Sequence, residues 1–314
     1  MYKILSIDGG GIRGLIPALF LAEIEERTGK PISEIFDLII GTSTGGILAC
    51  ALTLPDISQE APTPKYTAKE VVDFYFEEGE RIFKKIFGRG LFSLGFLFKA
   101  KYPITNLSNV LKEYFGEVEL AEALTEVITT SYETEVLADN YFFKSEKARN
   151  RAGENYAFWQ AATATSAAPT YFEPLKLGNH CLIDGGISMG NPAQEAINEA
   201  LSKGIDLKDI LLVSLGTGET HYSQPYTKVK KWGLAEWVQP LIKFIFRSNA
   251  NKVNYAMRQL LPLQNYYRFS PILKEEIEMD DASFANLSKM EGITRAEIEE
   301  KSLQISILCK KLLA

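Results

Sequence analysis

The sequence predicts an α/β fold in which a largely parallel sheet is covered by helices on both faces. Apolar, strand-like runs alternate with helix-like segments as far as Leu215, and helices dominate beyond it. This alternation is typical of successive βαβ units. Two glycine-rich turns also stand directly between a strand-like run and a helix-like one. Because open α/β sheets bind ligands at such strand ends, the same pattern predicts where a functional site lies.

The individual elements follow from apolar runs, caps and breakers. The first amphipathic helix ends at Gly29 and Pro31, Thr67 begins another helix, and Asn191 with Pro192 begins a later one. The expected strands are residues 2–7, 37–43, 127–131, 141–143, 180–184 and 210–215. The expected helices are residues 15–27, 46–54, 67–85, 155–166 and 192–203.

Composition and charge narrow the function classes. Hydrophobic residues make up 46% of the chain and charged residues 24%, which places it among ordinary soluble globular proteins. The formal net charge of -6 gives the chain as a whole no attraction to nucleic acid or to an anionic membrane. Cys50, Cys181 and Cys309 have no paired spacing, which argues against a disulfide framework or a thiolate metal site and fits a reducing compartment. We therefore expect no nucleic-acid partner, no metal and no cofactor.

A single domain over residues 1–314 is expected, because no linker or change of composition divides the chain. The first residues read as a strand and lack the basic region, apolar core and cleavage site of a secretory signal. No apolar run approaches the length that spans a bilayer. The sequence thus predicts a soluble, cytoplasmic protein that is at most peripheral to a membrane.

Ser43 is the candidate nucleophile. It lies in Gly41-Thr42-Ser43-Thr44-Gly45, between a strand-like run and a helix-like one. Glycines on both sides permit the sharp turn that pushes a nucleophilic hydroxyl out at the edge of a sheet. The alternative is a chance Gly-x-Ser-x-Gly, and the strand–turn–helix context favours the nucleophile.

The turn Gly9-Gly10-Gly11-Ile12-Arg13-Gly14 is the candidate anion-binding element. Its backbone N–H groups and the positive end of the following helix can hold either an oxyanion or a phosphate. Arg13 adds a fixed charge or pins the loop. The segment lacks the Gly-Lys-Ser/Thr ending of a P-loop, and its spacing differs from that of dinucleotide-binding folds. Besides a simple tight turn, the alternative to a hydrolase is a phosphate- or nucleotide-binding protein without hydrolase activity.

Asp184 is the candidate base, since a serine needs a partner that takes its proton. It closes a strand-like run ahead of two glycines, where its carboxylate is expected at the ligand-binding edge of the sheet. The chain has two histidines. His180 lies four residues before Asp184, more than about 10 Å away along a strand, whereas His221 follows Asp184 in the chain order of a Ser–Asp–His triad. A Ser43–Asp184 dyad and a triad with His221 both fit this pattern.

The chain resembles the patatin-like phospholipase family of lipid acyl hydrolases. Several independent motifs match in the family's order through most of the length. The matching segments are residues 8–14, 41–46, 164–172, 184–186 with 191–192, 214–218 and 279–283. The resemblance implies a three-layer α/β/α fold with a largely parallel central sheet and a Ser43–Asp184 dyad. It also implies an oxyanion hole formed by Gly9, Gly10 and Gly11.

The resemblance further implies a serine acyl hydrolase that acts on phospholipids or related lipids, with the lipid as its partner. Two apolar segments add a transient membrane surface as a second expected partner. Residues 87–99 and 232–246 are apolar segments near basic residues. Each fits a lid or membrane-contacting loop, or a buried core segment. Thr165 and Ser166 are expected to pack and cap a helix, and Cys50 to lie buried behind Ser43.

Overall fold

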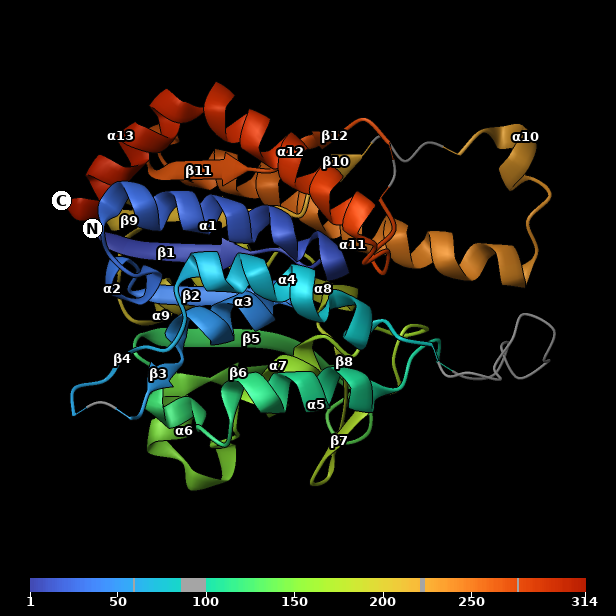
Figure 1. Ribbon diagram of the computed structural model, residues 1–314, viewed down its shortest axis with the longest axis horizontal. Helices are drawn as coiled ribbons and strands as arrows, with labels where there is room; N and C mark the ends of the chain where they lie inside the picture. The colour runs from blue at the N-terminus through green and yellow to red at the C-terminus, as the bar shows by residue number, and fades with distance from the viewer. Residues whose placement is uncertain (59, 86–99, 221–223, 276) are drawn as a thin grey trace.

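One sheet lies between two layers of helices in the computed structural model, which describes residues 1–58, 60–85, 100–220, 224–275 and 277–314 (Figure 1). The strands run in the order β11-β9-β1-β2-β5-β8-β7, and β6 also pairs with β5. Their bounds are β1 (Tyr2–Ile7), β2 (Leu38–Thr42), β5 (Glu126–Glu133), β6 (Asp139–Lys144), β7 (Leu175–Leu177), β8 (His180–Asp184), β9 (Ile210–Leu215) and β11 (Tyr266–Phe269). The expected three-layer α/β/α fold is confirmed.

The larger part of the sheet is parallel. β11, β9, β1, β2 and β5 pair in parallel, whereas β6 and β8 pair antiparallel with β5 and β7 pairs antiparallel with β8. The largely parallel sheet predicted from the sequence is therefore confirmed. β11 lies beyond Leu215, where the sequence predicted mainly helices.

Alternate strand residues face the two helical layers, as the two-residue period of a strand requires. In β1, Leu5 and Ile7 belong to the larger core cluster, and Ile4 belongs to the smaller cluster on the opposite face. The larger cluster is formed with α1 (Leu15–Thr28), α3 (Thr44–Thr53), α4 (Ala68–Ile82), α5 (Ile104–Phe115), α7 (Phe158–Thr165), α12 (Phe284–Glu300) and α13 (Ser302–Leu313). The smaller cluster is formed with α9 (Ala193–Ser202) and α11 (Leu234–Leu260).

Helix ends lie close to the positions that the sequence indicates. The side chains of Thr67 and Glu70 form a capping box at the start of α4. α1 ends at Gly29, whose φ of 66° is left-handed. The Asn191 Oδ1 accepts a hydrogen bond of 2.9 Å from the Ala193 N–H at the start of α9. Local capping chemistry thus sets these boundaries.

Short elements complete the described part of the chain. They include two small pairs of strands, β3 (Pro55–Asp56) with β4 (Thr63–Pro64) and β10 (Glu219–Thr220) with β12 (Ile272–Leu273). The short helices are α2 (Ile32–Ile35), α6 (Ser145–Asn150), α8 (Gly186–Met189) and α10 (Tyr226–Val229). The predicted lid segment at residues 87–99 lies outside the described residues.

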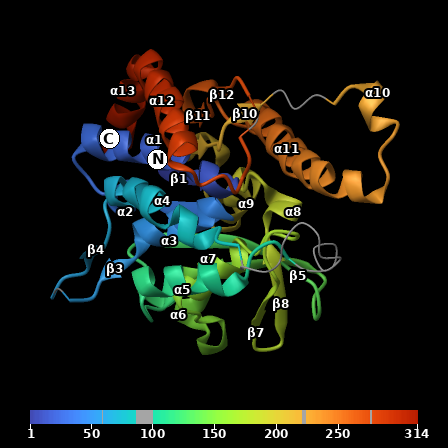
Figure 2. The ribbon, with the colours of Figure 1, turned by 45° about the vertical axis from the view of Figure 1, so that its right-hand side comes forward.

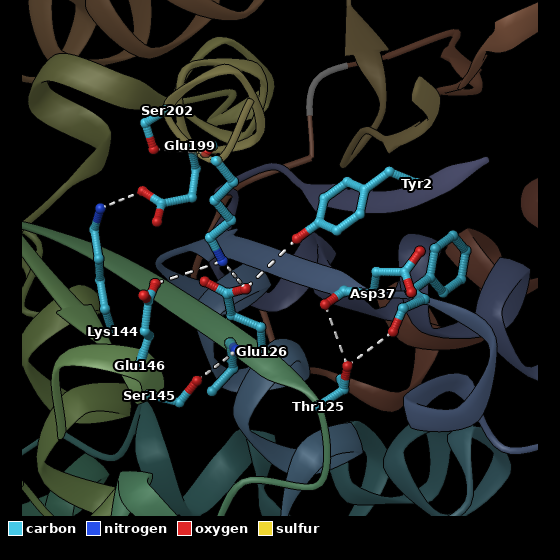
Figure 3. Close-up of polar contacts among 12 residues, drawn as sticks. Tyr2, Asp37, Thr125, Glu126, Lys144, Ser145, Glu146, Glu199 and Ser202 are labelled. Carbon is cyan, nitrogen blue, oxygen red and sulfur yellow. Dashed lines mark hydrogen bonds and ion pairs between the residues drawn. The ribbon is translucent and has the colours of Figure 1, made fainter. Parts of the chain in front are cut away.

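A charged cluster lies near the first residues of β1 and β5, Tyr2 and Glu126 (Figure 3). Glu199 is paired with Lys144, and Glu126 is paired with Lys203. Glu146 lies 3.5 Å from Lys203. The three carboxylates come within 4.8 Å of one another, and each of them is paired with Lys144 or Lys203. We interpret the cluster as a structural ion-pair network that joins β5, β6, α6 and α9.

α10 and the first turns of α11 project from the body of the molecule (Figures 1 and 2). They lie at the end toward which β1 points in Figure 1. Among the described residues, no helix combines the length and the apolar character that a bilayer span requires. α10 and the first turns of α11, which we call the projecting unit, thus share the end of the molecule where β1 and β2 lead into their turns.

Candidate active site

Ser43 lies in a strained turn between β2 and α3. Its backbone has φ 56° and ψ -126°, a left-handed φ that non-glycine residues rarely adopt. A Cβ atom on Gly41 would lie 2.0 Å from the Gly45 carbonyl oxygen, and one on Gly45 would lie 2.3 Å from the Ile7 carbonyl oxygen. Two glycines are therefore required for the backbone to fold this tightly, as expected for a nucleophile turn.

Side chains from neighbouring elements hold this turn in place. The Ser43 N–H donates a hydrogen bond of 2.9 Å to Thr165 Oγ1 on α7. Thr42 Oγ1 donates to the Met189 carbonyl oxygen at 2.7 Å and lies 2.7 Å from Thr130 Oγ1 on β5. From its sequence context, Thr165 was expected only to pack and cap a helix. Its bond to the Ser43 amide connects segments 122 residues apart and has no local sequence signal.

Asp184 reaches Ser43 through strand pairing. In the register of the sheet, Thr42 pairs with Thr130 of β5, and the next β5 residue, Ser131, pairs with Asp184. β8 is antiparallel to β5, so Asp184 does not end a parallel strand. Its pairing with Ser131 nevertheless brings it to the edge of the sheet where β2 leads into the Ser43 turn, as expected from the sequence.

The Asp184 carboxyl is fully buried and only partly hydrogen-bonded. Its Oδ1 accepts a bond of 2.7 Å from the Gly186 N–H, whereas Oδ2 has no hydrogen-bond partner within the described ranges. Burial raises the pKa of Asp184 to about 7, and the neighbouring Ser43 hydroxyl and the Gly186 N–H oppose this rise. The Ser43 hydroxyl is thus a neighbour that favours the charged form of Asp184, whereas Oδ2 accepts no hydrogen bond from a described residue.

The glycine-rich turn offers two unused backbone donors. The Gly9 N–H donates to the Gly190 carbonyl oxygen at 3.0 Å, so this amide is already engaged. In the part of the chain that the structure describes, the Gly10 and Gly11 amides have no acceptor. Gly11 has φ 60°, and a Cβ on Gly10 would lie 2.3 Å from Thr217 Oγ1. The Gly9 amide is therefore not available to an oxyanion, and the role of the Gly10 and Gly11 amides as oxyanion donors stays a prediction.

Arg13 stabilises this turn rather than facing Ser43. Its Nε donates to the Gly10 carbonyl oxygen at 3.4 Å, and its side chain lines a separate polar cavity. Behind the turn, Asp8 and Arg268 form a buried two-pronged ion pair of 2.9 and 2.6 Å. Arg268 comes from β11 and was not identified from the sequence.

An apolar cavity opens at Ser43. Gly11, Ser43 and Asp184 lie on its wall, together with Ser166, whose buried Oγ has no hydrogen-bond partner within the described residues. The rest of the lining is mainly apolar and comes from α3, α4, α5, α11 and the segment after α7: Ile47, Phe74, Ile82, Phe83, Leu107, Tyr171, Phe172, Ile242 and Phe246. Such a wall fits a hydrocarbon chain beside the nucleophile.

The histidines do not complete the described part of this site. His180 begins β8, Asp184 ends it, and the His180 ring contacts Tyr141 at a centroid distance of 4.9 Å. His180 is therefore not a partner of Ser43. His221 lies outside the described residues, so the triad that includes it stays a prediction. Cys50 is buried in α3, as the sequence predicts.

Comparisons with known proteins identify relatives along nearly the whole chain. The family model described as patatin-like phospholipase matches residues 5–197. Patatin-T5 of Solanum tuberosum is 33% identical, with 91% of this chain and 81% of the relative covered. Patatin-like protein 4 of Arabidopsis thaliana is 29% identical over 98% of this chain and 86% of the relative. A Solanum tuberosum protein named probable inactive patatin-3-Kuras 1 is 32% identical over 91% and 83%, respectively. Similarity to these relatives therefore does not by itself establish activity.

The close approach of the Ser43 turn to β1 predicts that Gly45→Ala destabilises the protein. The new methyl group would meet the backbone oxygen of Ile7, which cannot rotate away. We expect a loss of about 1–3 kcal/mol in the free energy of unfolding, measured by urea denaturation. Gly292→Ala is the matched control. Gly292 lies in α12 with open space around its Cα, so this change should stabilise by up to about 1 kcal/mol. Equal stability of both variants would contradict the steric account.

Proposed function

The chain belongs to the patatin-like phospholipase family of lipid acyl hydrolases, and we propose that it cleaves fatty acyl esters of phospholipids or related lipids with a Ser43–Asp184 dyad. One observation carries the proposal. A fully buried carboxyl, one oxygen of which has no hydrogen-bond partner among the described residues, lies beside a serine in a nucleophile turn, at the wall of an apolar cavity. The apolar wall supports an acyl chain rather than a nucleotide as the occupant.

In the proposed acylation step, Ser43 Oγ attacks the ester carbonyl while Asp184 Oδ2 takes the hydroxyl proton. Negative charge develops on the carbonyl oxygen, and the unused Gly10 and Gly11 amides stabilise it there. Asp184 then gives the proton to the leaving alcohol as the ester C–O bond breaks. The acyl chain remains bound to Ser43 in the apolar cavity.

Deacylation reuses the same groups. A water molecule loses its proton to Asp184 and attacks the acyl carbon, and the same amides hold the second oxyanion. Collapse of this intermediate returns the proton from Asp184 to Ser43 Oγ and releases the fatty acid. Every proton leaves and returns through one carboxyl group, so the cycle balances without a histidine.

The raised pKa of Asp184 makes a carboxylate an effective base for this chemistry. An ordinary aspartate, with a pKa near 4, is a weak proton acceptor at neutral pH. Burial raises the pKa of Asp184 to about 7. The group is then both substantially ionised and reasonably basic at neutral pH, which is the condition for efficient general-base catalysis.

The proposal includes a transient contact with a membrane surface through α10 and α11. Val238, Leu241 and Ile245 share one face of α11 and are 45%, 48% and 37% exposed. Ile242 and Phe246, from another face of this helix, line the Ser43 cavity. Near the start of α11 are a Trp232–Trp237 ring pair and the exposed lysines Lys228, Lys230 and Lys231. Apolar, aromatic and basic side chains together favour the interface of an anionic membrane.

The dyad predicts that Ser43→Ala and Asp184→Asn each reduce hydrolysis of p-nitrophenyl acyl esters by at least about a thousandfold, because each removes a proton-transfer partner. Both changes are small, so circular dichroism should show an intact fold. Asp209→Asn, at an exposed aspartate, is the matched control and should retain activity. His221→Ala should cost less than about tenfold. A thousandfold loss in His221→Ala with unchanged thermal stability would replace the dyad by a triad.

The membrane contact predicts that Leu241→Glu weakens binding to vesicles that contain phosphatidylglycerol, because a charge would replace an apolar anchor on α11. A severalfold lower bound fraction is expected in vesicle flotation. Leu303→Glu provides the control, since Leu303 is 76% exposed on α13, away from the projecting unit. Equal flotation of the two variants would remove α11 from the proposal and leave the dyad unaffected.

A further inference from the structure

A second cavity adjoins the one at Ser43. The two share Phe246 and Met279 in their walls, and the glycine-rich turn contributes Gly11 to the Ser43 cavity and Gly9 to the second. The second cavity has a volume of about 80 Å³, several times the roughly 10–15 Å³ that a single water requires. It is therefore large enough for a small polar group that is attached to a lipid lying at Ser43.

Unused hydrogen-bond donors line this second cavity. The Arg268 side chain is 7% exposed, and its two terminal nitrogens bind Asp8 while its Nε has no partner among the described residues. The buried Ser270 Oγ also lacks a partner there. Both residues belong to the cavity lining. Buried donors without acceptors cost free energy, and an anionic ligand would supply the missing acceptors.

Positive charge comes chiefly from α11. Arg247 lines the cavity and makes no hydrogen bond or ion pair within the ranges that the structure describes. Lys243 also lines it and is paired with Glu278, and Arg13 donates to the Gly10 carbonyl oxygen, so Arg247 is the cation on which the inference rests. Of the carboxylates in the lining, Asp8 is neutralised by Arg268, and Glu219 is exposed.

We propose that the second cavity binds the phosphodiester group of a phospholipid whose acyl ester lies at Ser43. Arg247 supplies the charge, and Arg268 Nε and Ser270 Oγ supply buried donors, a combination that suits phosphate oxygens. A few bonds separate the phosphate from the acyl carbonyl in a glycerophospholipid, and one glycine-rich turn separates the two cavities. The inference rests on the proposed function and makes it more specific. With a site for the phosphate, the enzyme selects phospholipids over neutral glycerides, which have no phosphate.

Binding can be measured without turnover in the Ser43→Ala protein. We expect Arg247→Gln in this background to weaken binding of dihexanoyl phosphatidylglycerol about tenfold, as measured by calorimetry below the micelle concentration. Arg258→Gln, at an exposed arginine of the same helix outside the cavity, should leave the affinity unchanged. Dihexanoylglycerol, which lacks the phosphate, should bind more weakly and should not distinguish the two variants.

In the protein that retains Ser43, a kinetic measurement tests directly whether the enzyme selects phospholipids over diacylglycerols. In mixed micelles, the ratio of kcat/KM for phosphatidylglycerol to that for diacylglycerol should fall about tenfold in Arg247→Gln and stay constant in Arg258→Gln. Equal ratios and equal affinities in both variants would overturn the headgroup site. Inorganic phosphate that binds as tightly as the phospholipid, and that loses affinity in Arg247→Gln, would assign the cavity to a free anion instead. If no ester is hydrolysed, the proposed function fails, while the binding measurement still decides the occupant of the cavity.

Discussion

Strand pairing around β5 is the constraint on which the whole candidate site depends. β2 pairs with β5 through Thr42 and Thr130, and β8 pairs with the next residue of β5 through Asp184. Ser43 directly follows Thr42, so the ladder of backbone hydrogen bonds brings the two side chains of the proposed dyad together. A slip of β8 by one residue would turn Asp184 to the opposite face of the sheet. The position of the proposed base is thus fixed by the register of the sheet, and the glycines around Ser43 allow the turn to approach Asp184.

Burial of Asp184 links the proposed catalytic role of this residue to the stability of the fold. The fold places the carboxyl group where water cannot solvate its charge, and this raises its pKa to about 7. A folded-state pKa above the unfolded value means that the folded protein holds a proton that the unfolded chain releases between about pH 4 and pH 7. The contribution of Asp184 to the free energy of unfolding therefore falls as the pH rises from about 4 to about 7. The protein tolerates this loss of stability at a position where the proposed base needs a pKa near 7. Such perturbed pKa values are common at functional sites.

Local signals identified the parts of the site that depend on local backbone geometry. The glycines around Ser43 and the glycine-rich turn mark tight turns, and the apolar runs mark strands, so these were predictable. Features of the site that depend on pairing between distant segments were not predictable from the sequence. The Arg268 ion pair with Asp8 joins residues 260 positions apart and requires β11, a four-residue strand. The engagement of the Gly9 amide by Gly190 and the bond from Ser43 to Thr165 likewise leave no pattern in the sequence.

The pH dependence of Ser43 reactivity tests the account most directly. A fluorophosphonate reacts with an activated serine, and intact-protein mass spectrometry followed by peptide mapping gives the rate at Ser43. Since only ionised Asp184 accepts the proton, the rate should rise with pH and reach half its maximum near pH 7, the pKa of the buried carboxyl. Asp184→Asn should lose this labelling at every pH. An unchanged rate and midpoint in Asp184→Asn, or a midpoint that disappears in His221→Ala instead, would contradict the claim that the buried carboxyl is the base.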